Sequence, residues 1–114
     1  MKDDIIKAYL YTALWAETDE NEEPLDYNYD ASDFSEEAVK QAQDDLVSFF
    51  CRVGDLINGH DKTTVVHDFW LTRNGHGAGF WDGDYENGDE LTEISQRFKE
   101  ISPYVGDDGR IYFI

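Results

Sequence analysis

Residues 65–91 have the sequence VVHDFWLTRNGHGAGFWDGDYENGDEL, and the fold predicted for the chain depends on the secondary structure assigned to this stretch. Its first residues, 65–72, place β-branched and aromatic side chains alternately on two faces, which is the pattern of a β-strand. The Asn74-Gly75 pair that follows is typical of a tight hairpin turn, because both positions tolerate positive φ. The stretch therefore predicts a β-hairpin in which residues 80–82 form the returning strand.

Two shorter segments carry helical periodicity. Apolar residues recur at four-residue steps from Ile6 to Leu14, which predicts a helix over residues 3–16. After the hairpin, Asp89 is a suitable N-cap, and the apolar residues from Leu91 to Ile101 are spaced as on one helix face. Both helices would turn an apolar face toward a common core.

The longest apolar repeat predicts the main helix of the core. It runs from Ala38 to Ile57, with Ser32 or Asp33 as its N-cap and a glycine shortly after its end as the stop signal. The periodicity indicates a helix of about 23 residues. Cys51 is the only cysteine and falls within this repeat, so we expect a small buried thiol and no disulfide.

The C-terminal segment predicts a second hairpin, with residues 104–105 and 111–114 on either side of an Asp-Asp-Gly turn. The resulting order is helix, helix, hairpin, helix, hairpin. It indicates an α+β fold with three helices packed on one face of a small antiparallel sheet built from two hairpins. The length of 114 residues fits a single domain covering residues 1–114.

Net charge is the strongest feature of the composition. The chain has 26 acidic and 9 basic residues, which gives a formal charge of −17. A field of this sign repels nucleic acid and anionic lipid and favours basic surfaces, so we do not expect direct nucleic-acid binding. No apolar run approaches the roughly 18 residues of a membrane span, and no secretory signal is recognised. These features predict a soluble cytoplasmic protein.

The acidic residues are concentrated in the N-terminal part of the chain. Residues 1–45 contain 14 acidic residues and three lysines, so they carry −11 of the total −17. Residues 17–33 have no apolar periodicity and predict a long loop, anchored by Leu25, Tyr27 and Tyr29; loops of this length are often functional. The candidate partner-binding residues are Glu17, Asp19, Glu20, Glu22, Glu23, Asp26, Asp30, Asp33, Glu36, Glu37, Asp44 and Asp45.

The central stretch supplies an alternative site, in which an arginine or histidine meets an anionic group and an aromatic ring stacks on a base. The candidate ligand-binding residues are His67, Arg73, Asn74, His76, Trp81 and Asp82. The same stretch also has a structural interpretation. In that interpretation the aromatic residues pack across strands, His67 is hydrogen-bonded on a half-buried face, and Arg73 is the centre of a group of ion pairs.

Recognised catalytic and metal-binding motifs are missing from the sequence. No serine lies in a Gly-x-Ser-x-Gly elbow, and the glycine-rich turn lacks the Gly-Lys-Ser/Thr ending of a phosphate loop. His67, His76 and Asp82 do not have the spacing of a known metal-ligand motif. We therefore expect no cofactor and no metal, and the sequence favours a protein that is not an enzyme.

The motif HDFWLTRNGHGAGFWDG, followed by a helix and an Asp-Asp-Gly hairpin, resembles a family of small acidic proteins encoded by tailed bacteriophages. The resemblance begins at YLYTALWAETDENEEPLD and extends to the final hairpin, so it covers most of the chain. It implies synthesis in an infected bacterial cytoplasm but transfers no activity. One departure is the loop DGDYENGDEL after Trp81, which is more acidic than the arginine-containing form of the family.

These observations favour an interaction protein over an enzyme. The leading hypothesis is an inhibitor of a host nucleic-acid-binding or defence protein, in which carboxylates take the place of DNA phosphates. The alternative is a small-ligand protein that binds or hydrolyses a nucleotide at the central stretch. Acidic residues clustered away from that stretch favour the first hypothesis.

Overall fold

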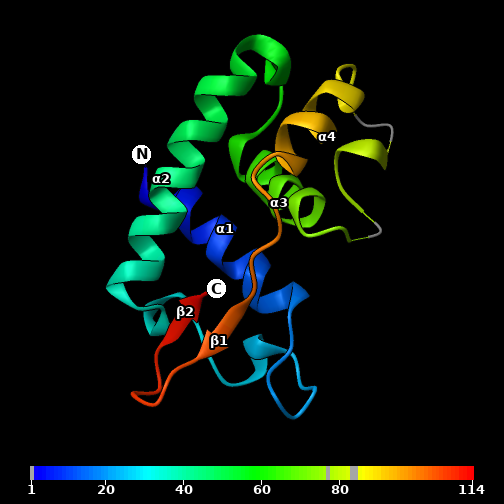
Figure 1. The fold of residues 1–114 in the computed structure, drawn as a ribbon. Helices are drawn as coiled ribbons and strands as arrows, with labels where there is room; N and C mark the ends of the chain where they lie inside the picture. Colours follow the sequence, from blue (N-terminus) through cyan, green and yellow to red (C-terminus); the bar gives the residue numbers. More distant parts are fainter. Residues whose placement is uncertain (1, 77, 83–84) are drawn as a thin grey trace.

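The computed structural model describes residues 2–76, 78–82 and 85–114. The described residues form an α+β fold of four α-helices, four short 3₁₀ helices and one two-stranded antiparallel sheet (Figure 1). The main elements are α1 (Asp3–Ala16), α2 (Glu36–Val53), α3 (Lys62–Arg73), α4 (Gly88–Gln96), β1 (Pro103–Val105) and β2 (Ile111–Phe113). The 3₁₀ helices are η1 (Leu25–Tyr27), η2 (Ala31–Asp33), η3 (Gly54–Ile57) and η4 (Phe80–Asp82).

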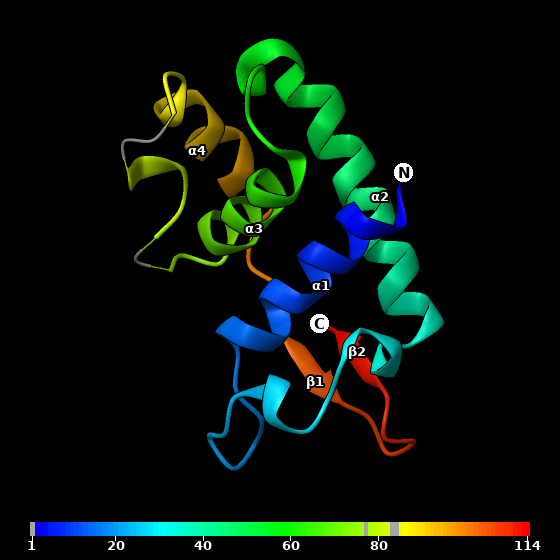
Figure 2. The same cartoon turned by 180° about the vertical axis from the view of Figure 1, so that it is seen from behind.

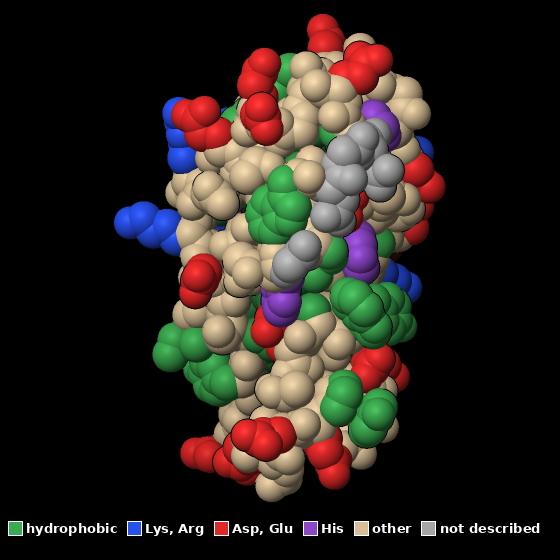
Figure 3. Space-filling view, turned by 90° about the vertical axis from the view of Figure 1, so that its right-hand side faces the viewer, with side chains coloured by type: hydrophobic (Ala, Val, Ile, Leu, Met, Phe, Trp, Pro, Cys, Tyr) green, Lys and Arg blue, Asp and Glu red, His purple; other side chains and the backbone are tan. Residues whose placement is uncertain are grey.

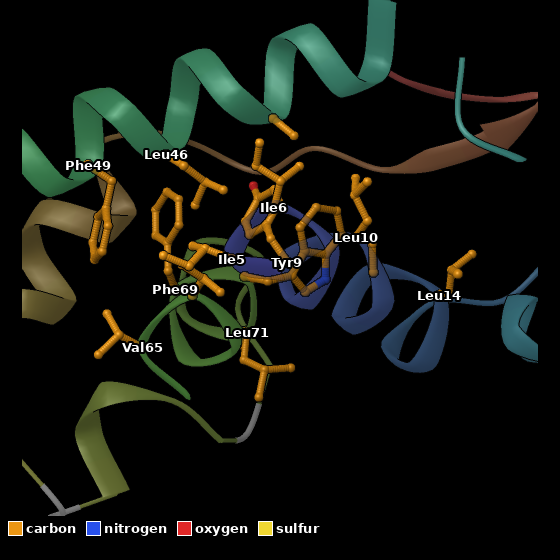
Figure 4. Close-up of a cluster of buried hydrophobic side chains, with 14 of the residues drawn as sticks. Ile5, Ile6, Tyr9, Leu10, Leu14, Leu46, Phe49, Val65, Phe69 and Leu71 are labelled. Atoms are coloured by element: carbon orange, nitrogen blue, oxygen red, sulfur yellow. The ribbon is translucent and has the colours of Figure 1, made fainter. Parts of the chain in front are cut away.

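Helix α1 lies between α2 and α3 and supplies the centre of the core (Figures 1 and 2). Its predicted apolar stripe is buried, and Tyr9 on the same helix is fully buried as well. Figure 4 shows Tyr9 lying among side chains from both neighbours, including Leu46 of α2 and Phe69 of α3. The structure confirms the predicted bounds of this helix, whose sequence carries a single amphipathic stripe.

Helix α2 begins later than the sequence predicts. Its N-cap is Ser35, whose Oγ accepts a hydrogen bond from the Ala38 backbone N–H at 3.1 Å. Neither Ser32 nor Asp33 caps it; Asp33 instead forms a capping box with Asp30 around η2. The α-helix ends at Val53, and the chain continues as the 3₁₀ helix η3.

The prediction of a buried Cys51 is wrong, because the thiol-bearing residue is exposed. The buried positions nearest to it on α2 are Leu46, Phe49 and Val53. At 3.6 residues per turn these positions share one helix face, and residue 51 points away from it. Of the helices in the described ranges, none is both long enough and apolar enough to cross a membrane.

The predicted strand over residues 65–72 is wrong, because these residues belong to α3. Asp61 caps the helix by accepting a hydrogen bond from the Thr63 backbone N–H at 2.9 Å. At the other end Gly75 has a φ of +71°, its N–H donates to the Thr72 carbonyl, and the His76 N–H donates to the Leu71 carbonyl. This is a Schellman motif, so the Asn-Gly pair ends a helix where a hairpin turn was expected.

The predicted returning strand is wrong for the same reason, because residues 80–82 form η4. The Phe80 backbone N–H donates to Thr72 Oγ1 at 3.1 Å, which attaches this turn to α3. The Phe80 ring is buried and stacks on Phe49 of α2 at 6.1 Å. The aromatic residues of the central stretch thus pack between helices rather than across strands.

Helix α4 and the C-terminal hairpin complete the structure. Helix α4 begins at Gly88, so Asp89 lies in its first turn and is not its N-cap; Leu91 is buried as predicted. The hairpin of β1 and β2 is confirmed, with Tyr104 opposite Tyr112. It lies at one end of the molecule, near the start of α2, and does not form a layer beneath the helices (Figures 1 and 2).

Candidate functional site

Arg73 is the most highly connected polar residue of the central stretch, and only 4% of it is exposed. Its Nε donates to the Lys99 carbonyl and its Nη2 to the Phe98 carbonyl, both at 2.9 Å. Its Nη1 donates to the Tyr9 hydroxyl at 3.1 Å and to Asp45 Oδ2 at 2.9 Å. The guanidinium therefore connects α1, α2, α3 and the chain that follows α4.

The surroundings of this guanidinium fix the protonation state of its phenol partner. Burial raises the pKa of Tyr9 well above its ordinary value of 10.0, and the nearby charge of Arg73 offsets only part of this rise. The Tyr9 hydroxyl is thus neutral and accepts the hydrogen bond from Arg73.

Asn74 extends the same connection. Its Nδ2 donates to the Trp70 carbonyl at 3.1 Å, and its Oδ1 accepts from the Ile101 backbone N–H at 2.8 Å. Arg73 and Asn74 together hold residues 98–101 against the end of α3. Arg73 has five N–H donors and already makes four hydrogen bonds, so the group expected to bind an anionic ligand is committed to the fold.

The two predicted site histidines have different partners on α1 or directly after it. His67 Nδ1 lies 3.0 Å from Thr12 Oγ1, whereas His76 Nε2 lies 3.2 Å from Glu17 Oε2. Neither histidine contacts Arg73 in the described hydrogen-bond network. No group of three or more potential metal ligands occurs among residues 2–76, 78–82 and 85–114, and the Asp82 side chain is outside the described part.

A partly exposed aromatic surface was missed by the sequence analysis. Trp15 is 60% exposed and lies 5.5 Å, ring centroid to ring centroid, from His67; Tyr11 on the same helix is 50% exposed. Together with Ala8 and Thr63 they line a shallow hollow between α1 and α3. Hydrophobic and histidine side chains also adjoin on the face drawn in Figure 3. The sequence contained one signal for this exposed surface, because Tyr11 and Trp15 lie off the apolar stripe of their helix.

Some of the candidate partner-binding acids are used within the fold. Glu17 pairs with His76, and Asp45 pairs with Arg73. Asp19 Oδ1 accepts from two backbone N–H groups of its own loop, which are those of residues 21 and 23. The acids of the η2 capping box also serve the local backbone, and Asp44 forms an exposed i,i+4 pair with a lysine of α2.

The remaining six candidate acids are exposed, and their carboxylates make no hydrogen bond or ion pair with another described residue. We call them the free acids. They lie in the loop after α1 and in the first turn of α2, at the end of the molecule that carries the hairpin (Figures 1 and 2). The free acids are Glu20, Glu22, Glu23, Asp26, Glu36 and Glu37.

The loop that carries most of the free acids is held in place by its own contacts. Thr18 and Pro24 form an isolated β-bridge, so the loop folds back on itself. Leu25 is 1% exposed and Tyr29 packs against the core, as predicted for anchors. Tyr27 is 72% exposed, so its predicted role as an anchor is wrong; the 3₁₀ turn η1 rotates it outward.

Two sets of candidate residues differ clearly in their surroundings. Arg73 and Asn74 stabilise the helical core, while the free acids cover the end of the molecule near the hairpin. Trp81 lies outside both groups and is 38% exposed. Comparison of the chain with protein-family models, with curated proteins and with solved structures finds no match.

Proposed function

We propose that this protein binds the basic surface of a nucleic-acid-binding protein, and that its carboxylates occupy positions otherwise taken by phosphates. The observation that carries the proposal is the group of free acids, which have no basic partner among the described residues. Unpaired carboxylates create a strong local negative potential. A basic surface that is built to bind phosphates is the complementary partner for such a potential.

The local structure of the acidic loop supports this proposal. Its bridge, its buried Leu25 and its two 3₁₀ turns hold the backbone before any partner binds. A surface that is ordered in advance loses less conformational entropy on association than a disordered acidic tail does. A backbone held in this way limits the positions that the carboxylates of the loop can reach, which suits recognition of an ordered array of lysine and arginine side chains.

The resemblance to small acidic proteins of tailed bacteriophages suggests the class of target. A phage protein of this charge would act in the infected bacterial cytoplasm as an inhibitor, or DNA mimic, of a host nucleic-acid-binding or defence protein. The commitment of Arg73 to internal hydrogen bonds favours this function over nucleotide binding at the central stretch.

The experiment is capture of partners from nuclease-treated bacterial lysate by the tagged protein, at low and at high salt, followed by identification of the captured protein. The purified captured protein is then mixed with labelled duplex DNA and increasing amounts of the acidic protein. We expect a basic nucleic-acid-binding protein that is retained at low salt, released at high salt and displaced from DNA by the acidic protein. Formation of a three-component complex without displacement of DNA would overturn the mimic mechanism.

Capture is repeated with two variants of equal charge, which serve as matched controls for each other. One variant replaces every free acid by its amide, which changes the net charge from −17 to −11. The other amidates six exposed acids elsewhere, namely Asp3, Asp4, Asp55, Glu86, Glu90 and Glu100, and carries the same charge. We expect capture to be lost with the first variant and kept with the second. Equal loss with both would show that total charge, not this surface, attracts the partner.

A further inference from the structure

The structure contains a strand edge that opens onto a hollow. Strand β2 is covered on both sides, because it pairs with β1 and its Ile111 carbonyl accepts from the Ser35 N–H at 2.8 Å. Strand β1 pairs only with β2 in the described sheet, so its second edge has no strand partner. The hollow beside it has a volume of about 430 Å³ and lies between this strand and the acidic loop.

The register of the hairpin identifies which backbone groups face this hollow. Ser102 and Ile114 exchange two hydrogen bonds, and the Gly106 N–H donates to the Arg110 carbonyl at 2.7 Å. In an antiparallel pair such positions alternate with residues whose N–H and C=O point away from the partner strand. Pro103 and Val105 are the alternating positions, so their backbone groups point to the open edge.

The open edge therefore offers three backbone groups: the N–H and C=O of Val105 and the C=O of Pro103. No hydrogen bond of the Val105 N–H occurs within the described part of the chain. Proline lacks an N–H, so the edge cannot extend into a long ladder. An incoming strand would form a short pairing centred on Val105, as in β-strand addition to a sheet edge.

The lining of the hollow indicates the chemistry of the incoming segment. Asp19, Glu20 and Asp107 carry carboxylates at it, and the rings of Tyr29 and Tyr104 also line it. Carboxylates attract lysine and arginine, and aromatic rings pack against the apolar stems and cationic ends of these side chains. A second copy of this chain is a poor occupant, because each copy carries a charge of −17.

We infer that the groove between β1 and the acidic loop binds an extended basic segment of the partner by β-strand addition at Val105. This inference rests on the proposed function, because it assigns the basic partner a specific place of attachment. Backbone hydrogen bonds would supply the register of binding, while the carboxylates supply selectivity for a basic sequence.

The test is an NMR titration of the labelled full-length protein with a short blocked peptide in which lysine and valine alternate. The control peptide has the same sequence with N-methylated backbone amides, so it keeps the charge and loses its hydrogen-bond donors. We expect the first peptide to shift the Val105 amide resonance, to protect that amide from hydrogen exchange, and to bind about tenfold more tightly than the control. Equal binding of both peptides would overturn β-strand addition. Protection of Val105 that grows with protein concentration in the absence of peptide would assign the edge to a second copy of this chain and overturn the inferred basic occupant.

Two protein variants complete the test. Val105→Pro removes the N–H at a strand edge where proline is tolerated, and Asp107→Lys reverses one charge at the groove without changing the strand backbone. We expect each to weaken binding of the alternating peptide, and the helical circular dichroism shows whether each variant is folded. If both bind the peptide as the wild type does, the inference fails. Capture of the partner by these same variants, with the free acids intact, would then show that the proposed function stands without it.

Discussion

Replacement of Arg73 by methionine is expected to destabilise the fold strongly. The substitution keeps an apolar stem but removes hydrogen bonds to Tyr9, Asp45 and the carbonyls of Phe98 and Lys99. Removal of one partner from a buried ion pair costs about 3–5 kcal/mol. The Asp45 side chain is 24% exposed, so water partly solvates the carboxylate that is left, and we expect the lower end of this range, about 3 kcal/mol.

The assay is urea unfolding followed by circular dichroism and tryptophan fluorescence, with an arginine in an exposed ion pair as the control. Arg97 pairs with Glu93 at 2.6 Å, but its side chain is 62% exposed. An exposed pair of this kind contributes about 0.5 kcal/mol or less, so Arg97→Met should have little effect. In a separate thermal scan we expect Arg73→Met to unfold about 12 °C below the wild type, because 1 kcal/mol corresponds to roughly 4 °C for a domain of this size.

Arg73→Lys separates charge from geometry. Lysine keeps the positive charge but lacks the planar fork that reaches several acceptors at once. We expect this variant to unfold at a urea concentration between those of the wild type and Arg73→Met. Equal free energies of unfolding for Arg73→Met and Arg97→Met, within about 0.5 kcal/mol, would refute the structural role of Arg73.

Four further expectations follow from local contacts. Gly79→Ala should lower the free energy of unfolding by about 1–3 kcal/mol in a urea titration, because φ at this position is +143° and a methyl group would collide with Thr72 Oγ1. Ser35→Ala should cost about 1 kcal/mol in the same assay through loss of the α2 N-cap, and Ser35→Asp should restore most of it. Hydrogen bonds from the backbone N–H and the hydroxyl of Thr63 hold the pKa of Asp61 below its ordinary value of 3.8, so the NMR titration midpoint of Asp61 should lie below 3.8. The stabilisation that the ionised Asp61 contributes is complete above pH 3.8 and is lost as the pH falls through the lowered pKa. Burial raises the pKa of Tyr9, so an alkaline titration of tyrosine absorbance should leave this phenol neutral until the protein unfolds, and ionisation of all seven tyrosines while the fold persists would contradict the buried position.

Elements with a single apolar face were predicted well from the sequence. Helix α1 and the C-terminal hairpin fall where their patterns place them, and α2 differs mainly at its N-terminus. Helix α3 was missed because it is buried on several faces: Val65, Val66, Phe69 and Trp70 are all fully buried. Such a segment shows an alternating and a helical pattern at once, and an apolar run alone does not distinguish them.

The ends of α3 explain the rest of that error. Asn-Gly favours positive φ both in a hairpin turn and at a helix C-terminus, so the pair alone does not distinguish these two structures. The capping residue Asp61, four positions before Val65, was the signal that pointed to a helix.

The candidate site was predictable in its charge but not in its geometry. A shortage of basic residues indicated a structural role for Arg73 at the centre of a group of ion pairs; the structure shows one ion pair, with Asp45, and neutral acceptors for its other hydrogen bonds. Its phenol partner Tyr9 is 64 residues away in sequence, and nothing in the spacing signals that contact. The open edge of β1 depends on where the acidic loop lies relative to the hairpin, which only the tertiary structure shows.

The central claim is that the free acids, and not the central stretch, attach the protein to its partner. The most direct measurement compares capture of the same partner by the free-acid amide variant and by a double variant, His76→Gln with Trp81→Phe, that alters the central stretch and keeps Arg73. We expect the first variant to lose the partner at low salt and the second to retain it with the salt dependence of the wild type. Retention by the first and loss by the second would contradict the account.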